Sequence, residues 1–210
     1  MNENTEIRTF QGTCEIRAGA EGEPTVLVGI APPWNTLSSE GALPGFREVF
    51  KRGAFSNLKD GEIVATLEHD NSKPLGRSSA GTLTLKDTPE GLRYEVELDP
   101  GRSHDADLMR SVERGDITGS SFEFFVSEDG DKWVEEAGAV TRTIKRGGGV
   151  LRQVGPVLSP AFRDAPAVSL RCEQKLAEIR EADEEATEQA ERDSANRRRE
   201  LDLAEAEALL

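Results

Sequence analysis

Glycine, proline and aromatic residues are confined to one part of this 210-residue chain. Every Phe, Trp, Tyr, Gly and Pro lies between residues 7 and 170, whereas residues 171–210 contain none of them. Tight turns depend on Gly and Pro, and aromatic side chains supply much of the buried area of a core, so the two parts are expected to fold differently. The sequence therefore predicts an N-terminal arm (residues 1–6), one folded domain (7–170) and a charged tail (171–210).

The predicted domain consists of short strands separated by turns. The expected strands cover residues 7–10 and 14–17 (separate or as a hairpin), 25–30, 63–67, 82–85, 92–98, 121–126, 141–144, 150–157 and 167–170. Residues 82–85 and 92–98 form the clearest hairpin, because the second arm alternates apolar and polar side chains. Residues 103–114 predict a helix that Arg114-Gly115 closes. This pattern is typical of a β-rich α+β domain or a barrel.

Three segments are expected to be loops. Residues 32–35 begin with two prolines, which cannot join a central ladder. Residues 37–45 and 128–138 are polar, and the second of these segments is rich in acidic side chains. We interpret both polar segments as solvated loops, with the lining of a substrate site as the alternative.

Composition and charge exclude several classes of partner. The net charge of −14 argues against binding to nucleic-acid phosphates or to anionic lipid. No apolar run approaches the roughly 18 residues that span a bilayer, and the polar, acidic start does not resemble a signal peptide. Cys14 and Cys172 lack metal-ligand spacing and are interpreted as free thiols in a reducing compartment. The sequence thus indicates a soluble intracellular protein without a cofactor, a nucleic-acid partner or a membrane partner.

The tail carries 13 acidic and 7 basic side chains. Its apolar positions, Leu176, Ile179, Ala182 and Ala186, form a narrow helical stripe that fades before Arg197. Two interpretations remain open. The tail is either a charged disordered extension or a solvated, partly frayed helix that a coiled-coil or other partner stabilises.

Two polar residues stand where strands are expected to end. His69 follows the strand 63–67, and the alternation of that strand places it on the same face as Leu67, at the edge of the core. A neutral histidine there can accept a proton. Ser121 and Ser120 compete as a nucleophile. Ser121 lies opposite the apolar face of Phe122, where a peptide can reach it, and Gly119 allows backbone N–H groups to approach. His104 is assigned to helix capping or solvent.

The order of several motifs resembles one known family. The series comprises Gly45-Phe46-Arg47-Glu48-Val49-Phe50, Gly53-Ala54-Phe55, His69-Asp70, Pro74-Leu75-Gly76-Arg77, Gly81-Thr82-Leu83, Gly91-Leu92, Arg114-Gly115-Asp116, Ser121-Phe122-Glu123-Phe124, Val154-Gly155-Pro156-Val157 and Pro160-Ala161-Phe162. In this order they resemble the prohead proteases, the head-maturation enzymes of tailed bacteriophages. The resemblance covers residues 7–170 and does not extend to the tail.

The resemblance implies both a fold and an activity. The implied fold is that of the herpesvirus assemblins, a β-barrel surrounded by helices. The implied activity is that of a serine endopeptidase in which His69 is the general base and Ser121 the nucleophile. Such enzymes act in the host cytoplasm inside the immature capsid, where they cut scaffold segments, the arm of the major capsid protein and finally themselves. The herpesvirus relatives are dimers, so self-association is also implied.

The third catalytic position departs from the family pattern. An acidic residue is expected near residues 151–154, where this chain has Gln153. A glutamine carbonyl can accept a hydrogen bond from the imidazole but cannot stabilise imidazolium by charge. Asp70, Glu68, Glu123 and Glu135 remain alternative sources of that charge. The oxyanion could be held by Arg142 or by a backbone N–H near Ser121.

The alternative function is a non-catalytic capsid assembly or scaffolding protein that retains the protease fold. Gln153 and the acidic tail favour it. The presence of both His69 and Ser121 in matching contexts argues against it.

Overall fold

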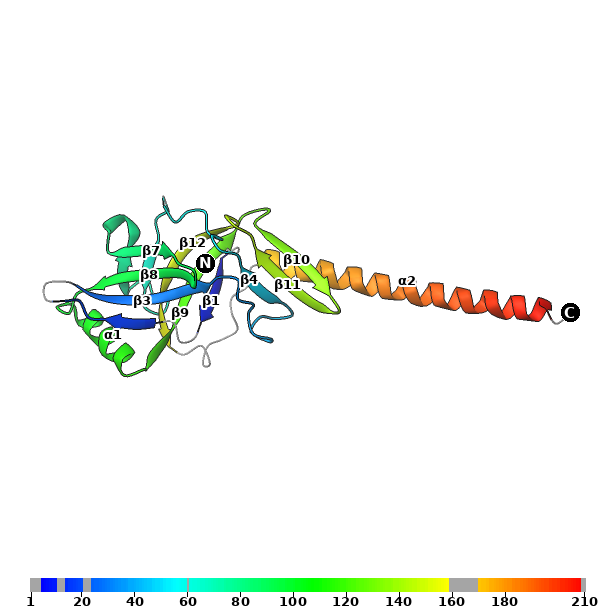
Figure 1. The fold of residues 1–210 in the computed structure, drawn as a ribbon, viewed down its shortest axis with the longest axis horizontal. Coiled ribbons are helices and arrows are strands. Elements are labelled where there is room, and N and C mark those ends of the chain that lie inside the picture. Colours follow the sequence, from blue (N-terminus) through cyan, green and yellow to red (C-terminus); the bar gives the residue numbers. More distant parts are fainter. Residues whose placement is uncertain (1–4, 11–13, 21–23, 60, 159–169, 209–210) are drawn as a thin grey trace. The chain divides into compact units, whose positions relative to one another are not determined.

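The structure is a computed structural model that describes residues 5–10, 14–20, 24–59, 61–158 and 170–208 (Figure 1). The chain divides into two compact units, residues 1–169 and residues 170–210. The first unit contains all of the strands. The second consists of a single helix, α2 (Leu170–Ala208).

A five-stranded sheet forms the centre of the first unit. Its strands, in spatial order, are β1 (Glu6–Phe10), β9 (Ile117–Val126), β12 (Gly149–Leu158), β5 (Val64–Thr66) and β6 (Pro74–Arg77). The pair β12–β5 is parallel and the other pairs are antiparallel. Neighbours in this sheet are far apart in the chain, so the sheet brings distant segments together.

Two smaller sheets and one helix complete this unit. A four-stranded sheet has the order β2 (Cys14–Arg17), β3 (Thr25–Pro33), β8 (Gly91–Leu98) and β7 (Leu83–Asp87). A three-stranded sheet has the order β10 (Asp131–Glu136), β11 (Ala139–Ile144) and β4 (Arg47–Phe50). Helix α1 (Ser103–Glu113) contacts β2 and β9, and a 3₁₀ turn (Ser78–Ala80) follows β6.

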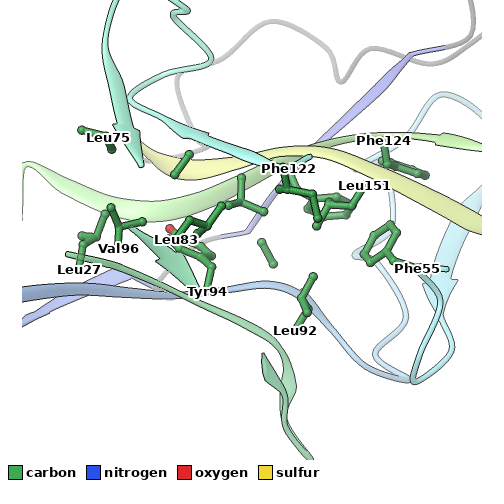
Figure 2. Packing of buried hydrophobic residues seen from close by; sticks show 14 of the residues in the cluster. Leu27, Phe55, Leu75, Leu83, Leu92, Tyr94, Val96, Phe122, Phe124 and Leu151 are labelled. Atoms are coloured by element: carbon green, nitrogen blue, oxygen red, sulfur yellow. The ribbon is translucent and has the colours of Figure 1, made fainter. Parts of the chain in front are cut away.

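Aliphatic and aromatic side chains fill the space between the sheets (Figure 2). Phe122 and Phe124 project from one face of β9 and lie 5.2 Å apart, measured between ring centroids. Phe50 meets both rings edge-on at 5.3 Å. Such edge-to-face pairs contribute beyond the area that they bury, so this cluster fixes the face of β9 that points inward. The opposite face of β9, which carries Ser121, is left for polar contacts.

Several predicted elements are confirmed. The hairpin of β7 and β8 is antiparallel, and α1 ends at Arg114 with Gly115 in a left-handed conformation. The β-rich α+β class is confirmed. The three sheets are open in the described part of the chain, so the closed barrel surrounded by helices is not confirmed.

Of the two alternatives for residues 7–10 and 14–17, separate strands are confirmed and the hairpin is not, because β1 joins β9 and β2 joins β3. Other predictions were wrong. Strand β3 continues to Pro33, since the two prolines lie beyond a bulge that ends the regular ladder. Residues 128–138 are not a loop, because β10 pairs with β11 along its whole length. Of the predicted strand 167–170, residues 167–169 lie outside the described residues and Leu170 begins α2.

Helix α2 corresponds to the helical alternative for the tail. Its described side chains from residue 181 to residue 199 are all exposed, including Ala182 and Ala186 of the predicted stripe. Ion pairs within the helix join Lys175 to Glu178 and Arg192 to Glu188. No helix in the described ranges combines the length and the apolar character required to cross a membrane.

Candidate active site

Strand β9 separates the two candidate serines onto opposite faces. Ser120 points inward with Phe122, and its hydroxyl lies 2.9 Å from the hydroxyl of Tyr94. Ser121 points to the other face, where its Oγ lies 2.6 Å from Nε2 of His69. Of the two serines, the structure therefore brings Ser121 to the histidine. Ser121 lies within the strand rather than at its beginning, because β9 starts at Ile117.

His69 lies in a turn and not on a strand, contrary to the predicted alternation from Leu67. Strand β5 ends at Thr66, and the next residues include two consecutive left-handed conformations, with φ of 60° at Glu68 and 57° at His69. Left-handed conformations are uncommon for residues other than glycine and cost on the order of 1–3 kcal/mol each. They turn the imidazole back over the sheet toward Ser121.

Strand β12 holds this turn in place. The amide of Glu68 donates to the carbonyl of Pro156 (3.1 Å). The carbonyl oxygen of Thr66 approaches Gly155 so closely that a Cβ at residue 155 would lie 1.8 Å from it. Because Gly155 is also the cross-strand partner of Ser121, this glycine allows the turn to approach the serine.

Gln153, the third predicted catalytic residue, completes a series of hydrogen bonds with His69 and Ser121. Oε1 of Gln153 lies 2.5 Å from Nδ1 of His69. The Nε2 amide of Gln153 donates in turn to Oδ1 of Asn71 (3.1 Å). Sequence reasoning missed Asn71, because an asparagine two residues after a histidine carries no motif and is read as a turn residue. The structure thus connects four side chains in the order Asn71, Gln153, His69 and Ser121.

Strand β1 covers the hydroxyl of Ser121. Thr9 is the cross-strand partner of Ser121, and its hydroxyl donates to Ser121 Oγ at 3.2 Å. Ser121 Oγ donates to the carbonyl of Arg8 at 2.9 Å. The predicted accessibility of Ser121 is therefore wrong for this state, in which the residue is fully buried. A substrate must displace these contacts to reach it.

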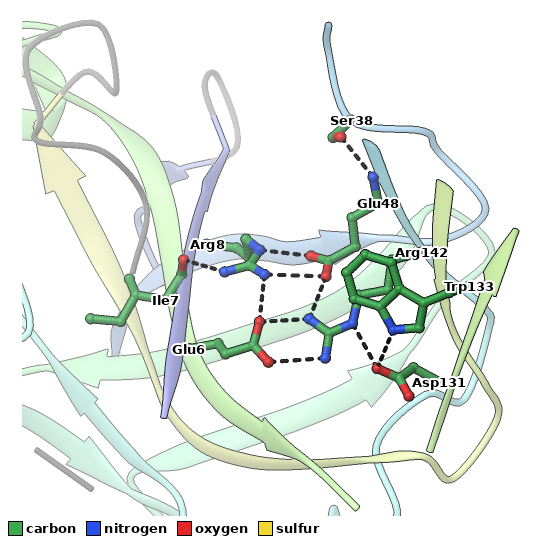
Figure 3. A network of polar contacts seen from close by, with 8 residues as sticks. All are labelled: Glu6, Ile7, Arg8, Ser38, Glu48, Asp131, Trp133 and Arg142. Carbon is green, nitrogen blue, oxygen red and sulfur yellow. Dashed lines mark hydrogen bonds and ion pairs between the residues drawn. The ribbon is translucent and has the colours of Figure 1, made fainter. Parts of the chain in front are cut away.

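A buried ionic network anchors β1 beside Ser121 (Figure 3). Arg8 bonds Glu6 at 2.6 Å and Glu48 at 2.7 Å. Arg142 bonds Glu6 at 2.6 Å, Glu48 at 3.0 Å and Asp131 at 2.9 Å. Burial alone would raise the pKa of Glu6, but the hydrogen bond and charge of Arg142, with the charge of Arg8, lower it. Arg142, a candidate for the oxyanion site, therefore bonds these three carboxylates through its guanidinium.

The remaining candidate residues have other partners. Asp70 bonds Ser72 and Lys73, and the carboxylate of Glu68 accepts from the amide of Leu158. His104 contacts Asp105 and the carbonyl of Pro74 at the start of α1. Glu135 lies on β10 in the three-stranded sheet.

Glu123 is the carboxylate whose field acts on His69. It lies two residues after Ser121 and is the cross-strand partner of Gln153. Burial lowers the pKa of His69, while the hydrogen bond that His69 donates to Gln153 and the charge of Glu123 raise it less, so the net direction is down. His69 is therefore neutral near pH 7 and able to accept a proton.

The thiol of Cys14 is not a competing nucleophile. Burial raises the pKa of the Cys14 thiol to about 12, so this thiol is not ionised at neutral pH. Neither Cys14 nor Cys172, both within the described residues, forms a disulfide.

Comparisons with known proteins identify the family of this chain. The chain is 25% identical over 187 residues to the protein named "Prohead protease" of Enterobacteria phage HK97, and the match covers 87% of this chain and 76% of that protein. No solved structure matches the chain. Residues 13–180 match the family described as caudovirus prohead serine protease. The matched range includes the first residues of α2. Because this match spans most of the sequence, the chain belongs to the family of caudovirus prohead serine proteases.

Proposed function

We propose that this chain is a serine endopeptidase of phage head maturation in which Ser121 is the nucleophile and His69 the general base. One observation carries the proposal: the 2.6 Å contact between Ser121 Oγ and His69 Nε2, with Gln153 accepting at the opposite imidazole nitrogen. Nucleophile, base and orienting group within hydrogen-bond reach define this type of site on many unrelated folds.

The proposed reaction proceeds in two steps. Ser121 Oγ attacks the scissile carbonyl carbon while His69 Nε2 takes the hydroxyl proton, and the imidazolium then gives that proton to the leaving amine. Water hydrolyses the resulting acyl-enzyme, with His69 acting again as base. Gln153 orients the imidazole through its carbonyl. The charge of Glu123 also favours the imidazolium, although less than burial disfavours it.

The family and the name of the HK97 relative support particular substrates and a place of action. The proposed substrates are the scaffold segments and the arm of the major capsid protein, followed by the chain itself, inside the immature capsid in the host. The resemblance also implies self-association, which sedimentation of the purified chain would test.

The experiment that tests the proposal combines cleavage with active-site labelling. The purified chain is incubated with the phage's major capsid protein, with and without a fluorophosphonate, and all masses are recorded. We expect fragments of the capsid protein, their loss after treatment, and an adduct on the peptide that contains Ser121. An adduct on another residue would contradict the role of Ser121. Intact capsid protein and intact chain after hours would favour the non-catalytic scaffolding alternative.

The pH dependence of cleavage follows from the environment of His69. The base acts only when neutral, and burial disfavours the charged imidazolium, so its pKa lies below the ordinary value. We therefore expect kcat/KM to fall in acid with a midpoint below about 6.5. Glu123 opposes this shift, while Glu68 and Asp70 are bonded to Leu158, Ser72 and Lys73. A pH–rate profile with a midpoint above about 6.5 would contradict the prediction.

A further inference from the structure

The neutral side-chain amide of Gln153 does not by itself determine which nitrogen of His69 carries the proton. An amide oxygen accepts from Nδ1–H, which leaves Nε2 free to take the proton of Ser121. An amide NH₂ has nearly the same shape but donates to Nδ1, which places the imidazole proton on Nε2. In trypsin-like triads the wrong tautomer costs about 10⁴-fold in kcat. The orientation of the Gln153 amide is therefore decisive for the proposed activity.

Ser121 has one proton and two acceptors within reach. The carbonyl of Arg8 lies 2.9 Å from its Oγ, and Nε2 of His69 lies 2.6 Å from it. When His69 carries its proton on Nδ1, the hydroxyl donates to His69. When the proton is on Nε2, the hydroxyl accepts from His69 and donates to Arg8. Two directions of hydrogen bonding thus compete, and one of them holds the nucleophile in a resting state.

Asn71 stands at the other end of this series of hydrogen bonds. Its Oδ1 accepts from the amide of Gln153 at 3.1 Å, and in this arrangement the Gln153 oxygen faces His69. We propose that Asn71 is a positioning residue that, through Gln153, selects the His69 tautomer able to accept the proton of Ser121. The inference rests on the proposed function for its effect on catalysis, and on the hydrogen bonds alone for its effect on the tautomer.

The backbone around Asn71 is fixed independently of its side chain. The amide of Leu67 donates to the carbonyl of Lys73, and the amides of Asp70 and Lys73 close the turn through Leu67 and Asp70. The side chain of Asn71 is itself exposed. Substitutions at residue 71 should therefore change the partner of Gln153 and leave the fold intact.

The chemistry of residue 71 predicts a ranked series of variants. Asn71→Asp can only accept, so it keeps Gln153 in the productive orientation and retains kcat. Asn71→Leu removes one neutral hydrogen bond, which changes the ratio of the two Gln153 orientations about fivefold and lowers kcat by up to that factor. Asn71→Lys can only donate, so it reverses the amide and should lower kcat by more than the leucine variant. Lys73→Gln, on the same turn but outside the series, is the matched control and should match the wild type.

A double variant separates positioning from a structural role. In Gln153→Glu the carboxylate accepts from Nδ1–H whatever residue 71 presents, so adding Asn71→Leu should cost nothing. Because a carboxylate stabilises imidazolium, Gln153→Glu should also move the acid limb of the pH–rate profile upward. A loss that persists in full in the Gln153→Glu background would mean that Asn71 acts only on the structure, and would overturn the inference.

The tautomer can be read without any assay of cleavage. The chain has two histidines, so imidazole ¹⁵N spectra of the wild type and of His104→Gln assign His69. We expect Nδ1–H in the wild type and in Asn71→Asp, and a shift toward Nε2–H in Asn71→Leu and Asn71→Lys. Unchanged spectra across these variants overturn the inference even if the protein cleaves its substrate. A wild type that shows the expected spectra but cleaves nothing contradicts the proposed function alone.

Discussion

Replacing Ser121 by alanine is expected to lower cleavage of the capsid protein by at least about 10²-fold in kcat. Loss of the nucleophile from a complete serine-protease triad costs about 10⁶-fold, because the remaining groups only bind and polarise the substrate. Gln153 supplies no charge here, so the wild type starts from a lower rate than a complete triad and the ratio is smaller. Fragment formation measured by mass spectrometry under single-turnover conditions gives the ratio of the wild-type rate to the Ser121→Ala rate.

Ser120→Ala is the control that the sequence itself provides. The two serines are neighbours on β9, both are buried, and both hydroxyls have partners, but Ser120 faces Tyr94. We expect Ser120→Ala to lose some stability and to keep its activity after correction for the folded fraction. If Ser120→Ala abolished cleavage and Ser121→Ala did not, the assignment of the nucleophile would be reversed.

Replacing Arg142 by methionine is expected to destabilise the first unit by about 3–5 kcal/mol. The side chain is 1% exposed and bonds three carboxylates, so its removal takes one positive charge away from Glu6, Glu48 and Asp131. The network buries two guanidinium groups with three carboxylates, so most of the cost comes from the buried carboxylates that lose a partner. Urea denaturation followed by tryptophan fluorescence, with Trp133 beside Arg142, measures the change.

An exposed ion pair provides the comparison. Arg110 bonds Asp107 on α1 at 3.0 Å, with both side chains at least 70% exposed. Arg110→Met should cost less than about 1 kcal/mol, because solvent screens such pairs. Equal losses for Arg142→Met and Arg110→Met would show that the buried network contributes no more than a surface contact.

The alternation of apolar and polar residues along the sequence predicted some strands correctly and missed others. The alternation of Leu92, Tyr94, Val96 and Leu98 predicts β8, and all four of these side chains are buried. Strand β10 was missed because its acidic residues suggested a solvated loop. The strand is defined by its pairing with β11, across which Arg142 lies over the ring of Trp133.

The candidate site was predictable in its residues but not in its connections. His69, Ser121 and Gln153 were identified through the order of motifs around them, and the structure places them in contact. The alternation rule failed at His69, because two left-handed residues cannot be inferred from a periodic pattern. Asn71 and the covering of Ser121 by β1 depend on strand pairing across more than 80 residues, which no local signal reports.

The pairing of β1 with β9 also determines when this arrangement can form during synthesis. Thr9 leaves the ribosome first, yet its partner Ser121 is 112 residues further along, and Gln153 follows later still. At about 5–20 residues per second, roughly 7 to 30 seconds separate the synthesis of Thr9 from that of Gln153. Before then, the nascent chain has neither its complete series of hydrogen bonds nor the strand beside them. The chemistry proposed for Ser121 therefore requires a chain that has been synthesised at least as far as Gln153.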